Sequence, residues 1–108
     1  MIRTTIHAGI CGFTTTVLAS SEDSQTVTLK IETNCDKIRK LTNGLTSVDA
    51  YDELGAGADG TILKLARVDA PRGICAGCVV PNGIFKAMQA AASLALPADV
   101  SLKIERVD

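Results

Sequence analysis

Four cysteines and one histidine are the side chains of this 108-residue sequence whose types and spacing best suit a chemical site. Two of the cysteines form the motif Cys75-Ala76-Gly77-Cys78, directly before a predicted helix. Two thiols three residues apart can chelate one metal ion or form a small disulfide. The dipole and free amides of a following helix favour the thiolate, which is the reactive, metal-binding form. Alternatively, both residues simply fill a turn, because cysteine is often buried as a small apolar side chain.

Three further candidate ligands precede this motif. Cys35 follows Asn34, a predicted helix N-cap, and would lie in the first turn of that helix. Cys11 lies in the turn Gly9–Gly12, which offers little core to bury it, and His7 ends the first predicted strand. In an antiparallel meander the first and third strands finish at the same end of the sheet. His7, Cys11 and Cys35 are therefore expected together at that end. Cys75 and Cys78 would join them if the closing strand ran parallel to the first strand.

The fold predicted to position these residues is α+β, in a single domain of residues 1–108. Apolar alternation predicts a mainly antiparallel four-stranded sheet, which consists of a three-stranded N-terminal meander and a C-terminal strand. Helices are expected to pack on one face of this sheet. Predicted strands are Ile2–His7, Phe13–Ala19, Thr26–Thr33 and the alternating Val100, Leu102 and Ile104; predicted helices begin at Asn34, Ser47 and Pro81, and residues 61–68 slightly favour helix.

Composition narrows the classes of function. The chain is 46% hydrophobic and 21% charged, which is typical of a globular protein. Net charge is −1, without a basic run or a set of stacking aromatic residues, so no nucleic acid partner is expected. No apolar stretch is long enough for a signal peptide or a membrane span, so we expect no membrane partner and a cytoplasmic location. Thiols stay reduced there, which favours metal binding, redox work or burial over structural disulfides.

Two weaker patterns receive structural interpretations. The segment Gly55–Gly60 matches G-x-G-x-x-G, but it follows a predicted helix rather than a strand, so we interpret it as a connecting loop. Asp49, Asp52 and Glu53 form an acidic cluster that a solvated helix face explains. With one histidine, no nucleophile elbow and no P-loop, hydrolase and transferase functions are disfavoured, and the sequence leaves open whether the protein is an enzyme.

The segment Gly73–Val107 resembles the C-terminal domain of NifU-type iron–sulfur scaffolds. The likeness consists of Gly73-x-Cys75-x-x-Cys78, then Gly83-Ile84 opening a helix, then a final strand led by Pro97. In those proteins the two cysteines hold a [4Fe–4S] cluster between two subunits, which leaves a homodimer open here. The likeness covers about a third of the chain, and Val79-Val80-Pro81 replaces the Pro-Ser-Ser that usually follows the second cysteine.

The whole chain resembles a family of small cysteine-containing proteins from anaerobic prokaryotes. The residues that carry this likeness are Cys78-Val79-Val80-Pro81 and Leu94-Ala95-Leu96-Pro97. The resemblance implies a fold and an anaerobic setting, without an activity.

Three functional hypotheses follow. The first is a metal- or iron–sulfur-binding protein in which Cys75, Cys78 and Cys35 are ligands, Cys11 is the fourth and His7 an alternate. Thiolate ligands suit zinc or an iron–sulfur cluster. The second is a thiol redox protein that works through Cys75 and Cys78. The third is a small interaction domain with inert buried cysteines.

Overall fold

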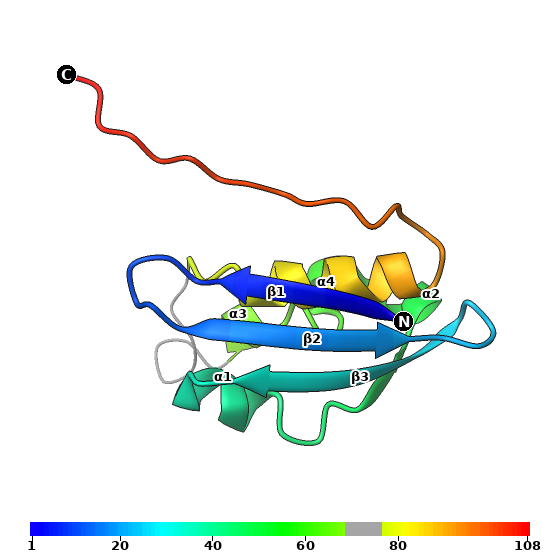
Figure 1. Cartoon of the computed structure of the whole chain (residues 1–108). Helices are drawn as coiled ribbons and strands as arrows, with labels where there is room; N and C mark the ends of the chain where they lie inside the picture. The colour runs from blue at the N-terminus through cyan, green and yellow to red at the C-terminus, as the bar shows by residue number, and fades with distance from the viewer. Residues whose placement is uncertain (69–76) are drawn as a thin grey trace.

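The fold is an antiparallel sheet covered by helices on one face, in a computed structural model that describes residues 1–68 and 77–108 (Figure 1). The sheet order is β1-β2-β3-β4, and every neighbouring pair is antiparallel. The described elements are β1 (Ile2–His7), β2 (Thr14–Ser20), β3 (Thr26–Thr33), α1 (Asp36–Leu41), β4 (Ser47–Asp49), α2 (Ala50–Ala56), the 3-10 turn η1 (Gly57–Asp59), α3 (Leu65–Val68) and α4 (Val80–Ala91).

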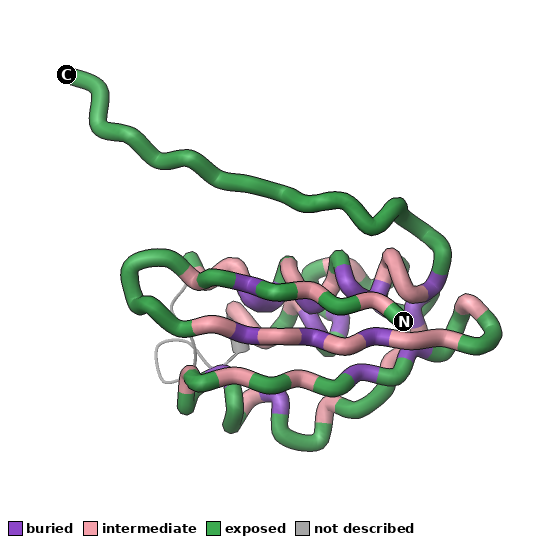
Figure 2. Tube along the Cα trace, in the orientation of Figure 1, coloured by how far each residue is buried: buried purple, intermediate pink, exposed green. Residues whose placement is uncertain are grey.

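The core lies between the sheet and α4. Along β2 the burial alternates residue by residue, so that Val17 and Ala19 are fully covered and their neighbours are half-exposed. Val27 and Leu29 continue the same apolar face on β3. Figure 2 shows this alternation of buried with half-buried or exposed residues along the strands. The other face carries mostly threonine and charged residues, as expected for an antiparallel sheet with one wet side.

Helix α4 packs closely against β1 and runs in the opposite direction. Pro81 occupies its first turn, where a missing N–H costs nothing, and Ile84 and Met88 are fully buried. Gly83 lies over the end of β1: a Cβ atom placed there would collide with Ile6, 2.8 Å from its Cγ1 and closer still to its Cδ1. Ile2, at the start of β1, lies beside the last turn of α4. The first turn of α4 therefore lies at the end of the sheet where β1 finishes.

The predicted α+β class and the antiparallel four-stranded sheet are confirmed, but the fourth strand was assigned to the wrong segment. It is Ser47–Asp49, which pairs with Thr26–Thr28, and not the stretch around Val100, Leu102 and Ile104. Residues 96–108 are extended and exposed and belong to no strand. Ser47 therefore does not begin a helix; the N-cap of α2 is Asp49, whose side chain accepts a hydrogen bond from the Asp52 backbone N–H.

The expected cap of the first helix was also displaced by one residue. Cys35 is the N-cap of α1, and the Asn34 side chain accepts a hydrogen bond from the Thr14 N–H across the sheet instead. Residues 65–68 form the short helix α3, in agreement with the slight helical preference of that stretch. At the other end of the chain, α4 finishes at Ala91, well before Pro97.

Candidate functional site

One end of the sheet carries four of the five predicted ligands. Because β1 and β3 run in the same direction and α4 runs against them, the last residues of both strands and the first residues of α4 share this end (Figure 1). His7 ends β1, Cys11 lies in the following turn, Cys35 follows β3, and Cys78 comes two residues before α4. Cys75 lies outside the described residues.

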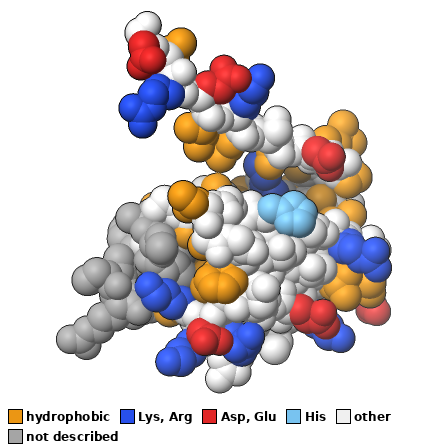
Figure 3. All heavy atoms as spheres, turned by 60° about the vertical axis from the view of Figure 1, so that its left-hand side comes forward, with side chains coloured by type: hydrophobic (Ala, Val, Ile, Leu, Met, Phe, Trp, Pro, Cys, Tyr) orange, Lys and Arg blue, Asp and Glu red, His pale blue; other side chains and the backbone are white. Residues whose placement is uncertain are grey.

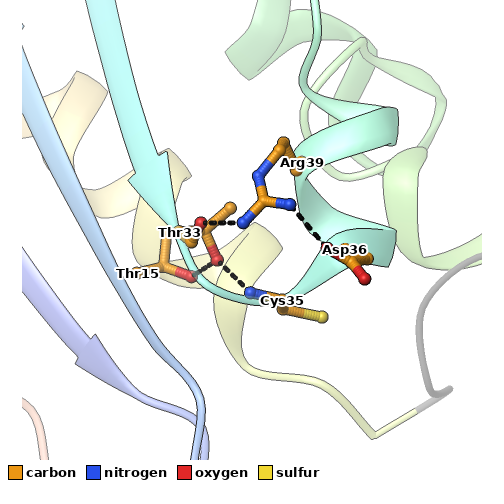
Figure 4. Close-up of polar contacts among 5 residues, drawn as sticks. All are labelled: Thr15, Thr33, Cys35, Asp36 and Arg39. Carbon is orange, nitrogen blue, oxygen red and sulfur yellow. Dashed lines mark hydrogen bonds and ion pairs between the residues drawn. The ribbon is translucent and has the colours of Figure 1, made fainter.

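Cys35 is held at a fixed backbone position. Its N–H donates to the Thr33 hydroxyl at 3.2 Å, and this hydroxyl lies 2.8 Å from that of Thr15 on the neighbouring strand. The Arg39 guanidinium donates to the Thr33 carbonyl and forms an ion pair with Asp36, which fastens the first turn of α1 to the end of β3. The Sγ atom points away from both threonines (Figure 4). The side chain is half-buried and packs against the hydrophobic core.

Cys78 has a comparable environment. It is half-buried and packs against the same hydrophobic core as Cys35, next to Val79 and the fully buried Val80. We call Cys35 and Cys78 the inner pair, because both side chains are partly shielded from solvent at the same end of the fold.

Cys11 and His7 lie on the rim of this end. The turn Gly9–Gly12 is closed by a 2.9 Å hydrogen bond from the Gly12 N–H to the Gly9 carbonyl, with both glycines at positive φ. This turn projects Cys11 into solvent. The His7 Nδ1 lies 3.3 Å from the Thr14 hydroxyl on the wet face of the sheet. Figure 3 shows this end, where the imidazole is exposed beside hydrophobic side chains.

Sharing one end of the sheet does not bring these side chains into a finished cluster. Among residues 1–68 and 77–108, no three His, Cys, Asp or Glu side chains lie close enough together to hold a metal ion. The predicted set of Cys75, Cys78, Cys35, Cys11 and His7 includes one residue beyond the described ranges and stays a prediction.

Glu53 is a buried charged residue whose role the sequence interpretation missed. It is only 5% exposed, whereas its neighbours Asp52 and Leu54 are exposed on α2. Its carboxylate accepts two backbone hydrogen bonds, from the Thr61 N–H at 3.1 Å and the Ile62 N–H at 2.8 Å. The interpretation of the acidic cluster as a solvated face is therefore wrong for Glu53. A helical carboxylate followed by a glycine-rich segment is the signal that could have indicated these two hydrogen bonds to Glu53.

The Gly55–Gly60 segment serves this same contact. Its first two residues, Gly55 and Ala56, end α2, and the next three form η1. A Cβ atom at Gly60 would lie 3.0 Å from the Glu53 Oε2, so the absence of a side chain lets the backbone approach the carboxylate. Gly57 and Gly60 belong to a turn beside a buried carboxylate. The interpretation as a connection between elements holds only from Gly57 onward, because Gly55 and Ala56 belong to α2.

Two aspartates, the exposed Asp23 and the half-buried Asp49, organise the opposite end of the sheet. The Asp23 carboxylate accepts hydrogen bonds from the Gln25 and Thr26 backbone N–H groups, which lower its pKa. The Asp49 carboxylate accepts from the Asp52 N–H and the Gln25 amide, and these bonds lower its pKa as well. Both carboxylates stabilise turns in their ionised form.

Fold and site together define a small α+β protein with cysteines gathered at one end of an open antiparallel sheet. The chain belongs to a family of unknown function (DUF6951), whose model matches residues 2–104. No curated protein and no solved structure matches the chain. Within the described residues, no helix has both the length and the apolar character needed to cross a membrane.

Proposed function

We propose that this protein binds a metal ion or an iron–sulfur cluster through thiolates at the α4 end of the sheet. Cys75, Cys78 and Cys35 are the ligands, Cys11 is the fourth, and His7 is its alternate. The observation that carries the proposal is the inner pair: Cys35 and Cys78 come from distant parts of the sequence, yet both are half-buried against one core at the same end.

The chemistry of this end suits a soft metal site. Thiolates are the preferred ligands of zinc and of iron–sulfur clusters, and partial burial shields such a centre from solvent. The hydrogen bonds around Thr33 hold the Cys35 backbone before any metal arrives, which lowers the entropy cost of binding. The proposal includes a reducing cytoplasmic setting, with neither nucleic acid nor membrane as a partner. The likeness of Gly73–Val107 to NifU-type domains is consistent with an iron–sulfur cluster.

The test is anaerobic expression of the full chain, followed by an absorption spectrum and quantitative metal analysis. A bound cluster gives visible absorption with iron and sulfide, and zinc gives a colourless protein with one metal per site. Cys35→Ser, Cys75→Ser and Cys78→Ser should each reduce bound metal well below stoichiometry. Cys11→Ser is the matched control on the rim and should lose less, because His7 can replace that ligand.

Two other results would replace the proposal with an alternative. A colourless protein with substoichiometric metal, in which thiol titration detects a reversible disulfide between Cys75 and Cys78 after mild oxidant, would instead identify a redox protein. A metal-free protein in which all four cysteines can be replaced at only a packing cost would identify an interaction domain with inert thiols.

A further inference from the structure

The strand β1 leaves one side of the sheet open. Among the described strands it pairs only with β2, so its outer side is a sheet edge. The Ala8 N–H donates to the Phe13 carbonyl at 3.1 Å across the hairpin. Because ladder bonds alternate along an antiparallel pair, the backbone groups of Thr4 and Ile6 also face β2, and those of Arg3, Thr5 and His7 face outward. This edge can therefore accept another strand.

The opposite edge strand of the sheet is β4, which has only three residues. β4 covers the first part of β3, and the Leu29 N–H donates to the Thr46 carbonyl just beyond it. At the end of β3 the Thr33 carbonyl accepts from Arg39. Of the two edge strands, β1 with six residues is therefore the one long enough to pair with a full added strand.

The C-terminal arm, residues 96–108, has the pattern of a strand without a partner strand in the described structure. Its apolar residues Val100, Leu102 and Ile104 alternate with Ser101, Lys103 and Glu105, and the three apolar side chains are 68–93% exposed. The Lys103 and Glu105 side chains form a 2.9 Å ion pair on the polar side of the arm. The family match extends to residue 104, so this alternating stretch belongs to the part of the chain that the family shares.

The chain leaves α4 through a hydrogen-bonded turn, and the arm that follows lies outside its own sheet. The Leu94 N–H donates to the Gln89 carbonyl and the Ser93 N–H to the Ala90 carbonyl, with Ser93 at φ 62°. This is a Schellman motif, which fixes the direction in which the chain leaves a helix. Pro97 then restricts Leu96 to an extended conformation. Figures 1 and 2 show the arm leaving the domain as an exposed extended segment.

We propose that the arm of one copy of this chain adds as a strand to the open β1 edge of a second copy, and that two copies exchange arms reciprocally. The arm supplies about six alternating residues, which matches the six residues of β1. In this pairing Val100, Leu102 and Ile104 continue the apolar face made by Ile2 and Ile6. The polar side, with Lys103 and Glu105, continues the wet face that carries Arg3.

The partner is a second copy because the arm and the β1 edge match in length and alternation, and yet the arm lies exposed outside the sheet of its own chain. An apolar hollow at the start of β1, lined by Ile2, Ala90 and residues 93–97, lies where the arm leaves α4. Exchange of a segment between identical chains is a low-cost route to a dimer, because each copy makes the contacts that the other provides. The inference is independent of the cysteines.

The test uses two full-length variants, each of which disables one half of the contact. Thr5→Pro removes an outward N–H from the edge without removing a β1–β2 ladder bond, and Thr5→Ala is its matched control. Leu102→Asp charges the apolar side of the arm, and Ser101→Asp places the same charge on the polar side. By light scattering, the unaltered chain and both controls should have the dimer mass, and Thr5→Pro and Leu102→Asp should be monomers.

Mixing the two monomeric variants distinguishes two arrangements. In one the arm binds the β1 edge of a second copy, and in the other it binds the β1 edge of its own chain. The intact arm of Thr5→Pro can add to the intact edge of Leu102→Asp, so the mixture should regain a species of dimer mass. With one exchange instead of two, its dissociation constant should be about a hundredfold weaker or more. If circular dichroism shows that Thr5→Pro is unfolded, a peptide of residues 96–108 titrated onto the Leu102→Asp chain replaces it and should bind.

A chain that stays monomeric at millimolar concentration would overturn the proposal. So would a dimer that persists in both Thr5→Pro and Leu102→Asp, because a different surface would then hold it. A mixture of the two variants that stays monomeric, or an arm peptide that does not bind, would likewise rule out exchange.

Discussion

At the scale of single residues, Glu53 is the side chain whose environment departs furthest from its type. A buried carboxylate is costly unless hydrogen bonds replace its water. Here the Thr61 and Ile62 N–H groups supply two, and both belong to a turn that would otherwise bury unsatisfied donors. Glu53 therefore connects α2 to the segment that begins at Thr61.

Glu53→Gln tests these two hydrogen bonds with almost no change in side-chain volume. The amide oxygen can accept one of the two N–H groups, but the amide nitrogen would face the other donor, which would remain buried without an acceptor. We expect the free energy of unfolding to fall by about 1–3 kcal/mol in urea denaturation. The control is Glu32→Gln on the exposed side of β3, which should change stability by less than about 0.5 kcal/mol. Equal effects at both sites would contradict this role of Glu53.

At the scale of elements, the close approach of α4 to β1 depends on a position without a side chain. Gly83 lies over Ile6, which is buried at the end of β1. A glycine inside a helix costs about 1 kcal/mol relative to alanine, so its presence in the first turns of α4 has a packing explanation. The contact sets the spacing between the helix and sheet layers at the end where the cysteines lie.

Alanine substitutions at two helical glycines should have opposite signs. Gly83→Ala should destabilise the fold by about 1–3 kcal/mol, because its methyl group collides with Ile6. Gly55→Ala, in α2, meets no atom within 4 Å and should stabilise by about 0.5–1 kcal/mol. Thermal unfolding of both variants measures the difference. The double variant with Ile6→Val, which removes the colliding Cδ1, should recover part of the loss; no recovery would place the cause elsewhere.

How far the sequence predicts an element depends on whether its signal is local. The alternation in β2 and β3 and the apolar spacing of α4 are local, and each is confirmed. The alternation at Val100, Leu102 and Ile104 is equally clear, but a period of two does not say which edge a strand joins or whether that edge is in the same chain. The helix N-cap predicted at Asn34 lies at Cys35 for a related reason. The Asn34 side chain accepts a hydrogen bond from Thr14 on the neighbouring strand, which the local cap pattern does not reveal.

The candidate site, too, could be predicted from the sequence only where the signal is local. Strand directions in a meander follow from the sequence, so a common end for His7, Cys11 and Cys35 could be predicted. The different exposure of Cys11 and Cys35 depends on a glycine turn and on the packing of α1, which no spacing rule includes. Glu53 bonds amides eight and nine residues away, at a distance set by the turn between them.

At the scale of the whole molecule, acid should weaken the fold through two carboxylates that accept hydrogen bonds in their ionised form. The pKa values of Asp23 and Asp49 are lower in the folded protein than the ordinary 3.8. The unfolded chain therefore binds more protons near that pH, and stability rises with pH there. The contribution is fully present above about pH 4–5 and is lost as the pH falls through the folded values.

The measurement is the urea midpoint of the full chain between about pH 2 and pH 7. We expect the midpoint to fall on the acid side, and the Asp23→Asn and Asp49→Asn double variant to flatten that fall. Glu22→Gln, a neighbouring exposed carboxylate, is the control and should leave the pH profile unchanged. A double variant with the unaltered profile would show that other groups cause the acid sensitivity.

The hydrogen-bonded turn from which the C-terminal arm leaves α4 also bears on how many copies could join in the proposed exchange. An arm on an edge is a head-to-tail contact, and such contacts extend into filaments unless the geometry returns the second arm to the first copy. Ser93 and Pro97 set the angle at which the arm leaves, so backbone torsions at these residues separate a closed pair from open-ended growth. In the proposed exchange, the helix cap of α4 would therefore decide between a closed pair and a growing filament.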